Sequence, residues 1–181
     1  ALNPGLSMPS DCPKRLFGGP LLMFIGAIDA YKLHLHLLEV LAKRHPRWTF
    51  CLIGPVGEAD PTTDVSALAR LSNVHLLGPR PYQDLPAYLS QADVALLPLQ
   101  LNDYTRSMYP MKFFEYLAAG CPVVATAIPA LADQADVAML CPPDASAFEA
   151  AIRRALEQKG PGLEQRLERS RLNTYFTRTR A

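Results

Sequence analysis

Six apolar runs of strand length follow one another along the chain, and segments with a helical pattern separate them. The runs are LLMFIG (21–26), WTFCLIG (48–54), VHLLG (74–78), DVALLPL (93–99), PVVAT (122–126) and VAMLC (137–141). Each run is continuously apolar rather than alternating, which is typical of strands buried on both faces of a parallel sheet. The order of runs and helical segments therefore predicts an α/β fold, a doubly wound parallel sheet of about six strands with helices on both faces.

The intervening segments predict the helices. Leucines recur at helical spacing in YKLHLHLLEVLAKRH (31–45), and DLPAYLSQA (84–92) and DASAFEAAIRRALEQ (144–158) show the same apolar periodicity. After a break at KGPG (159–162), LEQRLERSRLNTYF (163–176) predicts a last helix rich in arginine. Ligands of such sheets bind beyond the carboxyl ends of the strands, so we expect the functional residues in the loops that lead from strand to helix.

Composition limits the partners of this chain. Its 181 residues, 49% of them hydrophobic, are enough for one domain and short for two. Lys and Arg number 18 against 17 Asp and Glu, so the balance of charge predicts no nucleic-acid partner and places any anion site in a local feature. The first 19 residues have the composition of a loop and are expected to be an extension or the remnant of a linker.

The four cysteines are far apart in the sequence and form no CxxC pair. Cys51 and Cys121 lie in apolar runs, where a thiol behaves as a small hydrophobe, so the cysteines favour a reducing cytoplasm and no metal site. No apolar run of about 18 residues and no signal-peptide pattern is visible in the sequence, so we expect neither a membrane span nor a signal peptide.

The segment YPMKFFEYLAAGCPVVAT (109–126) predicts an anion site. Pro110 suits the first position of a helix, because its missing N–H would be unpaired there, and Tyr109 before it has no oxygen that caps a helix well. The next amides would then point outward at the positive end of the helix dipole, and these are the amides of Met111, Lys112 and Phe113. A phosphate at this end would also meet the charge of Lys112.

Glu115 lies one turn further on the same helical face, within reach of a hydroxyl beside such a phosphate. The same residues have a structural interpretation, in which Lys112 and Glu115 form a solvated surface pair and Ser107 folds back as a substitute cap. Local physics leaves both interpretations open. Gly120 is predicted to end the helix.

The segment PMKFFEYLAAGCPVVAT resembles the donor-site helix and the following strand of glycosyltransferases of the GT-B architecture, in the group 1 type. FIGAIDAYKLHLHLLEVLAKRHPRWTFCLIGP (24–55) and NVHLLGPRPYQDLPAYLSQADVALLPL (73–99) are similar to the first and central units of the same domain. The resemblance covers about residues 20–150 and implies a Rossmann-like C-terminal half of a GT-B enzyme, which binds a nucleotide sugar.

The resemblance implies roles for individual residues. Glu115 matches the glutamate that holds the ribose hydroxyls, and Lys112, after Met111, matches a basic residue beside the diphosphate. Gly26 matches the glycine whose backbone approaches the donor phosphates, and Lys32 is the nearest candidate for the basic partner of that loop. The segment 78–82 matches the part of the family that packs against the base, where Arg80 is the candidate.

The sequence also departs from the family pattern. Many members carry a second glutamate, and the position that would hold it is Ser107. The preceding segment LNDYTRSMYP resembles a subgroup in which an acidic residue and a Thr-Arg pair occur, so Asp103, Tyr104 and Arg106 become candidates for contacts with the sugar or its phosphates. For Arg106, a salt bridge to Asp103 that only shapes the loop is an equally good interpretation. The donor sugar and the stereochemical outcome stay open.

The resemblance implies that residues 20–158 are the donor-binding half of a metal-independent glycosyltransferase, with Lys112 and Arg106 as the groups that meet the charge of the leaving phosphate. The acceptor is expected to bind a missing N-terminal domain, so the isolated domain should transfer little or no sugar, and residues 159–181 are expected to hold a truncated helix. We expect a cytoplasmic protein, peripheral at the inner membrane face if the intact enzyme uses a membrane-linked acceptor. The alternatives are a nucleotide-sugar 2-epimerase and a non-catalytic nucleotide-binding or scaffold module.

Overall fold

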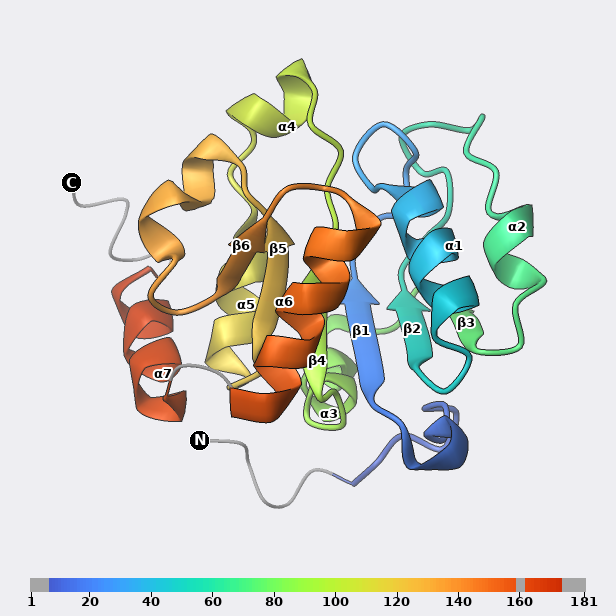
Figure 1. The fold of residues 1–181 in the computed structure, drawn as a ribbon, viewed down its shortest axis with the longest axis horizontal. Coiled ribbons are helices and arrows are strands. Elements are labelled where there is room, and N and C mark those ends of the chain that lie inside the picture. The colour runs from blue at the N-terminus through green and yellow to red at the C-terminus, as the bar shows by residue number, and fades with distance from the viewer. Residues whose placement is uncertain (1–6, 159–161, 174–181) are drawn as a thin grey trace.

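The computed structural model describes residues 7–158 and 162–173, which form a six-stranded sheet in which every pair of neighbouring strands is parallel (Figure 1). The strand order is β3-β2-β1-β4-β5-β6. The strands are β1 (Leu21–Ile25), β2 (Thr49–Ile53), β3 (Val74–Gly78), β4 (Val94–Leu97), β5 (Val123–Thr126) and β6 (Met139–Cys141). Every predicted run is a strand, so the prediction of a doubly wound sheet is confirmed.

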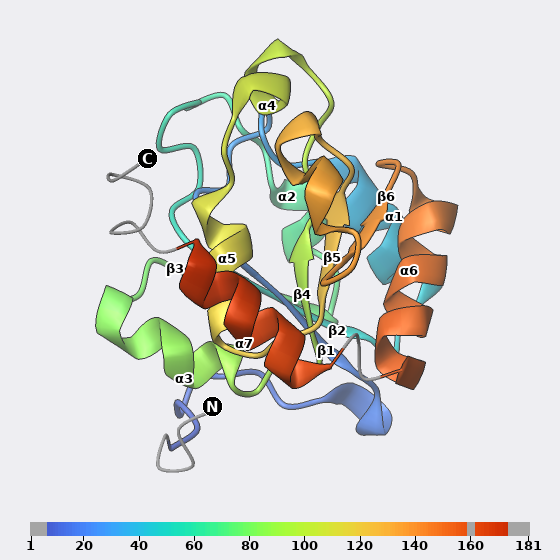
Figure 2. The same cartoon turned by 90° about the vertical axis from the view of Figure 1, so that its left-hand side faces the viewer.

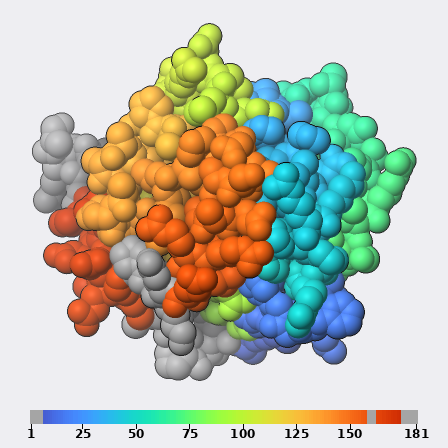
Figure 3. All heavy atoms as spheres, viewed as in Figure 1, coloured from blue at the N-terminus to red at the C-terminus, as the bar shows by residue number. Residues whose placement is uncertain are grey.

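Helices cover both faces of the sheet, as predicted: α1 and α6 lie on one face, and α3, α5 and α7 lie on the other (Figure 2). The helices are α1 (Leu35–Arg44), α2 (Ser66–Ala69), α3 (Leu85–Leu89), α4 (Asp103–Ser107), α5 (Met111–Ala118), α6 (Ala145–Gln158) and α7 (Leu163–Leu172). The short 3₁₀ segments are Leu16–Gly18, Tyr82–Asp84 and Pro129–Gln134. Figure 3 shows the atoms of α1 and α6 side by side over the front face.

Strands β1, β2, β4 and β5 are buried along their whole length, which explains why their sequences do not alternate. The largest side chains of the core include Phe50, Phe113, Tyr116 and Phe148, each with an exposed fraction of 1% or less. The topology switches direction between β1 and β4, so a crevice is expected where the loops after these two strands diverge.

The segment before β1 packs on the domain. Cys12 is buried in the core, and Arg15 donates two hydrogen bonds to Asp93, at 3.0 and 3.1 Å. The Asp93 carboxylate also accepts the amide of Leu21 at 2.7 Å. The described part of the predicted extension is therefore fixed to the start of β1 and β4.

The last helix is shorter than predicted: α7 ends at Leu172, and residues 174–176 of the predicted helix lie outside the described residues. Helix α7 packs against α5. Its Arg166 is 3% exposed and donates to the carbonyl of Gly120 at 2.8 and 3.1 Å, so α7 is anchored to the end of α5.

Candidate functional site

The carboxyl ends of β1, β2 and β4 and the start of α5 surround a hollow that we call the strand-end cleft. It consists of two adjoining cavities of about 160 and 150 Å³ that share Ile25, Gly26, Ala27 and Lys112 as lining residues. Lys32 and Met111 line the first cavity, and Arg80 lines the second. A third cavity of about 220 Å³ lies beside them between Tyr82 and Glu115. The structure thus gathers six predicted site residues around these adjoining cavities, from three segments: the loop after β1, the loop after β3 and helix α5.

The start of α5 differs by one residue from the prediction. Pro110 is the residue before the helix, with no capping side chain, and Met111 is the first helical residue. The amide of Met111 donates to the carbonyl of Tyr109, and that of Phe113 donates to the carbonyl of Pro110, both at 3.0 Å. The prediction of three outward amides was therefore wrong, because the chain tightens around Pro110. Of the three, the amide of Lys112 has no hydrogen-bond partner among residues 7–158 and 162–173.

The end of α5 follows the prediction. Gly120 has a φ of 75°, its amide donates to the carbonyl of Leu117, and the amide of Cys121 donates to that of Tyr116. This pair of bonds is a Schellman motif, which requires a left-handed residue that glycine supplies at low cost. Residues 119–121 thus turn the chain directly into β5.

Lys112 and Glu115 form an ion pair in this structure, with Nζ 2.7 Å from Oε2 and each side chain 32% exposed. The Lys112 ammonium also lies 5.6 Å from the centre of the Tyr82 ring. The surface pair that we considered is therefore present, and its lysine lines the strand-end cleft while its glutamate lines the third cavity. Ser107 does not cap α5, because its hydroxyl donates to the carbonyl of Asp103 within α4.

The Lys32 ammonium lies near a carboxylate and two aromatic rings. Its ammonium lies 3.2 Å from a carboxylate oxygen of Asp29, 5.0 Å from the Tyr31 ring centre and 5.8 Å from that of Tyr104. Burial acts to lower the pKa of Lys32, but the Tyr31 hydroxyl and the Asp29 carboxylate outweigh it and hold the pKa above its ordinary value. Lys32 is therefore a fixed cation at the cleft.

Arg80 points its guanidinium toward the segment before β1. Its Nε donates to Asp11 at 3.0 Å and to the Tyr88 hydroxyl at 3.1 Å, and Nη1 donates to the carbonyl of Pro79 at 2.9 Å. The Tyr88 hydroxyl donates to Asp11 at 2.6 Å, and together with Arg80 it holds the pKa of Asp11 below its ordinary value. Arg80 thus lines the cleft while its donors serve this internal network.

Asp103, Tyr104 and Arg106 lie on α4, a short helix where the sequence predicts a loop. Asn102 and Thr105 form a capping box, in which each side chain bonds the backbone amide of the other. All three predicted side chains are exposed, and Tyr104 meets Tyr31 edge to face with ring centres 5.0 Å apart. Within the described part of the chain Arg106 makes no salt bridge with Asp103, so the loop-shaping pair was wrong.

Sequence reasoning missed two residues that shape the cleft. Gly54 follows β2 with a φ of 148°, and a β-carbon there would lie 1.9 Å from the carbonyl oxygen of Gly26. The segment GPVG (54–57) by itself predicts only a turn. Tyr116 is fully buried, and its hydroxyl accepts the amide of Ile25 at 2.8 Å and donates to the carbonyl of Ile25 at 3.1 Å. The glycine was a usable signal, whereas the tyrosine looked like ordinary core.

We expect Tyr116→Phe to lower the free energy of unfolding by about 2–3 kcal/mol, because it leaves the buried amide and carbonyl of Ile25 without the hydroxyl that both bond. Urea denaturation followed by circular dichroism measures the change. Tyr82→Phe is the matched control: Tyr82 is 72% exposed, so we expect a change of less than about 0.5 kcal/mol. Equal losses in the two variants would contradict the bridging role of Tyr116.

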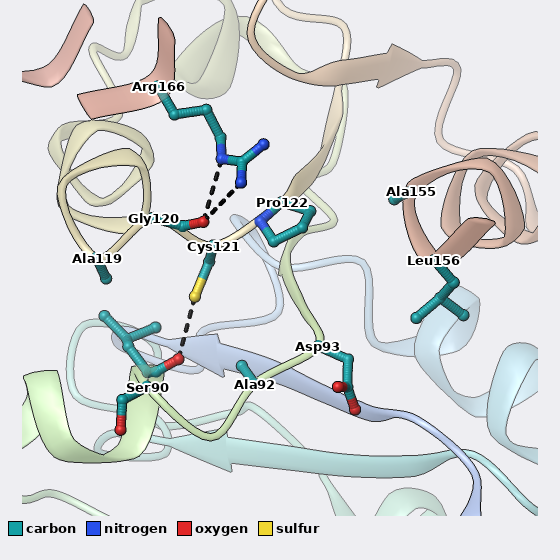
Figure 4. Close-up of a pocket in the computed structure, with 11 residues that line it drawn as sticks. Ser90, Ala92, Asp93, Ala119, Gly120, Cys121, Pro122, Ala155, Leu156 and Arg166 are labelled. Atoms are coloured by element: carbon teal, nitrogen blue, oxygen red, sulfur yellow. Dashed lines mark hydrogen bonds between the residues drawn. The ribbon is translucent and has the colours of Figure 1, made fainter. Parts of the chain in front are cut away.

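A further cavity, of about 280 Å³, lies at the opposite ends of the strands, among α3, the end of α5, α6 and α7 (Figure 4). Arg166 and Asp93 lie on different sides of it, and Cys121 points its thiol to the carbonyl of Leu89 at 3.1 Å. Burial raises the pKa of Cys121 to about 12, so this thiol is not a reactive nucleophile. The cavity contains none of the predicted site residues.

The described residues contain neither a cluster of side chains arranged to bind a metal nor a helix able to span a membrane. No group of three or more His, Cys, Asp or Glu side chains within them is arranged to hold a metal ion. None of the helices in the described ranges is both long and apolar enough to span a bilayer.

Comparison with known proteins shows the family of this chain. The family model described as glycosyl transferases group 1 matches residues 19–158. A protein of Bacillus subtilis (strain 168) that carries the name teichuronic acid biosynthesis glycosyltransferase TuaH is 40% identical over 114 residues, which are 61% of this chain and 28% of that protein.

Solved structures share the fold. HepE of Anabaena, in complex with UDP and glucose, has a TM-score of 0.65 at 18% identity, covering 84% of this chain and 43% of HepE. Sucrose-phosphate synthase of Thermosynechococcus elongatus has a TM-score of 0.61 at 23% identity, covering 84% of this chain and 40% of that enzyme. The chain thus spans less than half the length of each of these relatives.

Proposed function

Because the chain belongs to the group 1 glycosyltransferases, we propose that it is the donor-binding half of an enzyme that transfers a sugar from a nucleoside-diphosphate sugar to an acceptor. The observation that carries this proposal is the position of Lys112. It stands at the start of α5 and lines both cavities of the strand-end cleft together with Gly26, at the switch point of a doubly wound sheet. A helix start with an added cation is a favourable place for a phosphate.

The diphosphate would lie between the Gly26 loop and the start of α5. The amide and the ammonium of Lys112 donate to it from one side, and the ammonium of Lys32 from the other. As the bond to the sugar breaks, negative charge accumulates on the leaving phosphate, and cations fixed beforehand in a shielded cleft stabilise that charge most. Lys112 is thus the proposed catalytic group of this half, and no metal ion is required. Arg106 on α4 is a second candidate, which must turn from solvent toward the phosphates.

The nucleoside would extend into the cavity between Tyr82 and Glu115. Ribose hydroxyls would donate to the Glu115 carboxylate, which must then release Lys112 to the phosphates. Tyr82 is 72% exposed and forms the other wall, so its ring is available to stack on a base. Arg80 is already engaged by Asp11 and Tyr88, and we assign it to shaping the second cavity of the strand-end cleft, with Tyr82 making the contact to the base.

The solved HepE structure is a complex with UDP and glucose, and we propose a UDP-sugar as the donor of this chain. The name of TuaH concerns teichuronic acid, and we propose a cell-surface polysaccharide as the class of product, built on a membrane-linked acceptor. The acceptor would bind a second domain in the part of the relatives' length that this chain does not span. Alone, the chain should bind nucleotide and transfer little or no sugar.

The two alternatives are less favoured. A 2-epimerase needs an internal acid and base, and among the described residues the lining of the strand-end cleft includes neither a histidine nor a carboxylate. A scaffold module would leave the cleft empty. The family match supports the transferase over both.

The test is calorimetric titration of the 181-residue chain with UDP, GDP and ADP. We expect UDP to bind and Lys112→Ala to weaken its binding about tenfold or more, since a charge-assisted contact with phosphate is lost. Lys43→Ala is the control. Lys43 is also a helix lysine paired with a glutamate, at 2.5 Å from Glu39, but it lies on α1 away from the cleft, and its loss should change binding less than twofold. A folded chain that binds none of the three nucleotides would contradict the proposal.

A further inference from the structure

The Asp29 carboxylate is completely buried in the loop between β1 and α1. Its Oδ1 accepts the amides of Ala59 at 3.0 Å and Asp60 at 3.1 Å, and its Oδ2 lies 3.2 Å from the ammonium of Lys32. Burial acts to raise the pKa of Asp29, but the two amides and Lys32 outweigh it and hold the pKa below its ordinary value. Asp29 is therefore a charged group that keeps its charge inside the protein.

The same loop is tied to the loop after β2 along its length. The amide of Ile28 donates to the carbonyl of Pro55 at 2.8 Å, and the amide of Gly57 donates to the carbonyl of Ile28 at 3.0 Å. The amide of Ala30 donates to the hydroxyl of Thr63 at 3.0 Å. These bonds join the two loops without the second oxygen of Asp29, whose partner is Lys32.

The surroundings of Lys32 restrain its side chain. A lysine side chain has four rotatable bonds and loses up to about 2 kcal/mol of rotamer entropy when it is fixed. Here its side chain is 22% exposed, its ammonium is paired with Asp29, and the rings of Tyr31 and Tyr104 flank it. The Lys32 ammonium therefore already has a fixed position at the strand-end cleft before a ligand binds.

We propose that Asp29 is a positioning residue of the donor site: its buried carboxylate holds the Lys32 ammonium where the donor phosphates bind. This inference rests on the proposed function, because it takes the ligand of Lys32 to be a diphosphate. Asp29 makes no contact with that ligand and acts through Lys32.

The sign of the change in UDP binding distinguishes a positioning role of Asp29 from simple electrostatic repulsion. A carboxylate near a phosphate repels it, so replacing Asp29 by neutral asparagine should by itself strengthen the binding of an anion. A positioning role predicts the opposite, because an ammonium without its partner must be ordered by the ligand. We expect Asp29→Asn to weaken UDP binding about tenfold.

The experiment is a double-mutant cycle on the 181-residue chain, with Asp29→Asn, Lys32→Met and the double variant, each titrated with UDP by calorimetry. If Asp29 acts through Lys32, Asp29→Asn has less than about a twofold effect in the Lys32→Met background. If Asp29 only stabilises the loops, the loss is the same in both backgrounds, which would overturn the inference. Unchanged or stronger binding of UDP by Asp29→Asn would also overturn it.

Asparagine keeps an oxygen for the amides of Ala59 and Asp60, so we expect Asp29→Asn to fold, and circular dichroism checks this. If it does not fold, Asp29→Glu replaces it in the same cycle, because the extra methylene displaces the ammonium and the same loss of coupling is expected. Asp64→Asn is the matched control: its carboxylate accepts the amide of Ser66 at 2.8 Å and pairs with no lysine of the described residues, so it should leave binding unchanged.

The outcomes separate this inference from the proposed function. If the unmodified chain binds none of UDP, GDP and ADP, both fall together. If it binds UDP and Lys112→Ala weakens that binding, while Asp29→Asn does not, the proposed function stands and the role of Asp29 is wrong.

Discussion

Replacing Gly54 by alanine is expected to lower the free energy of unfolding by about 3–5 kcal/mol and to weaken nucleotide binding with it. The new β-carbon would lie 1.9 Å from the carbonyl oxygen and 2.7 Å from the carbonyl carbon of Gly26. Both atoms belong to the backbone, so no side chain can turn away. The ends of β1 and β2 must separate, although the amide of Gly26 bonds the carbonyl of Ile53 at 2.9 Å. Urea denaturation and UDP titration measure the two effects.

Gly78→Ala is the matched control for this prediction. Gly78 has a φ of 70°, and a β-carbon there meets nothing within 4 Å. Its replacement therefore introduces backbone strain without a clash, for which about 1–2 kcal/mol is expected. If Gly54→Ala lowers the free energy of unfolding no more than Gly78→Ala does, the close contact between Gly54 and Gly26 is not what holds the ends of β1 and β2 in place.

Glu115→Ala is expected to weaken UDP binding about 100-fold, because a carboxylate that accepts two ribose hydroxyls contributes about 1.5–3 kcal/mol per hydrogen bond. The same variant should leave the binding of inorganic pyrophosphate unchanged or stronger. The reason is the ion pair of 2.7 Å with Lys112, whose loss frees the ammonium for phosphate. Calorimetric titration with both ligands measures the contrast.

Lys112→Ala should give a different pattern and serves as the reference. It should weaken UDP and pyrophosphate together, since it removes the phosphate contact and leaves the ribose contact in place. If Glu115→Ala weakens both ligands equally, Glu115 acts only by supporting Lys112, and the assignment of the ribose to this carboxylate is wrong.

Much of the fold was predictable because its signals are local. The six continuous apolar runs became the six strands, and the glycine at 120 ended α5 as its chemistry requires. The short helices α2 and α4 were missed, because four or five residues are too few for an apolar period to appear. The start of α5 was displaced by one residue, since the backbone bonds around Pro110 depend on a turn that proline alone does not specify.

Sequence reasoning predicted part of the lining of the strand-end cleft, but Asp103, Tyr104 and Arg106 do not line it. Gly26, Lys32, Arg80, Met111 and Lys112 do line one cleft, as parallel strands that end at the same edge require. The partners of these side chains could not be inferred. Arg80 is bonded by Asp11 from a segment expected to be a linker, and Lys32 is bonded by Asp29, which no sequence pattern marked.

The sequence by itself determined the class of fold, the order of its elements and the loops that carry charge, because burial on both faces of a sheet and helix punctuation leave marks on neighbouring residues. Only the tertiary structure decided which charges pair and where backbones touch. The Asp29 carboxylate accepts the amide of Ala59, and Gly54 lies against the carbonyl of Gly26, with about 30 residues of chain between the partners in each case. Such contacts depend on how two loops pack in space, and a single position gains its partner only when the sheet has brought both loops to one edge.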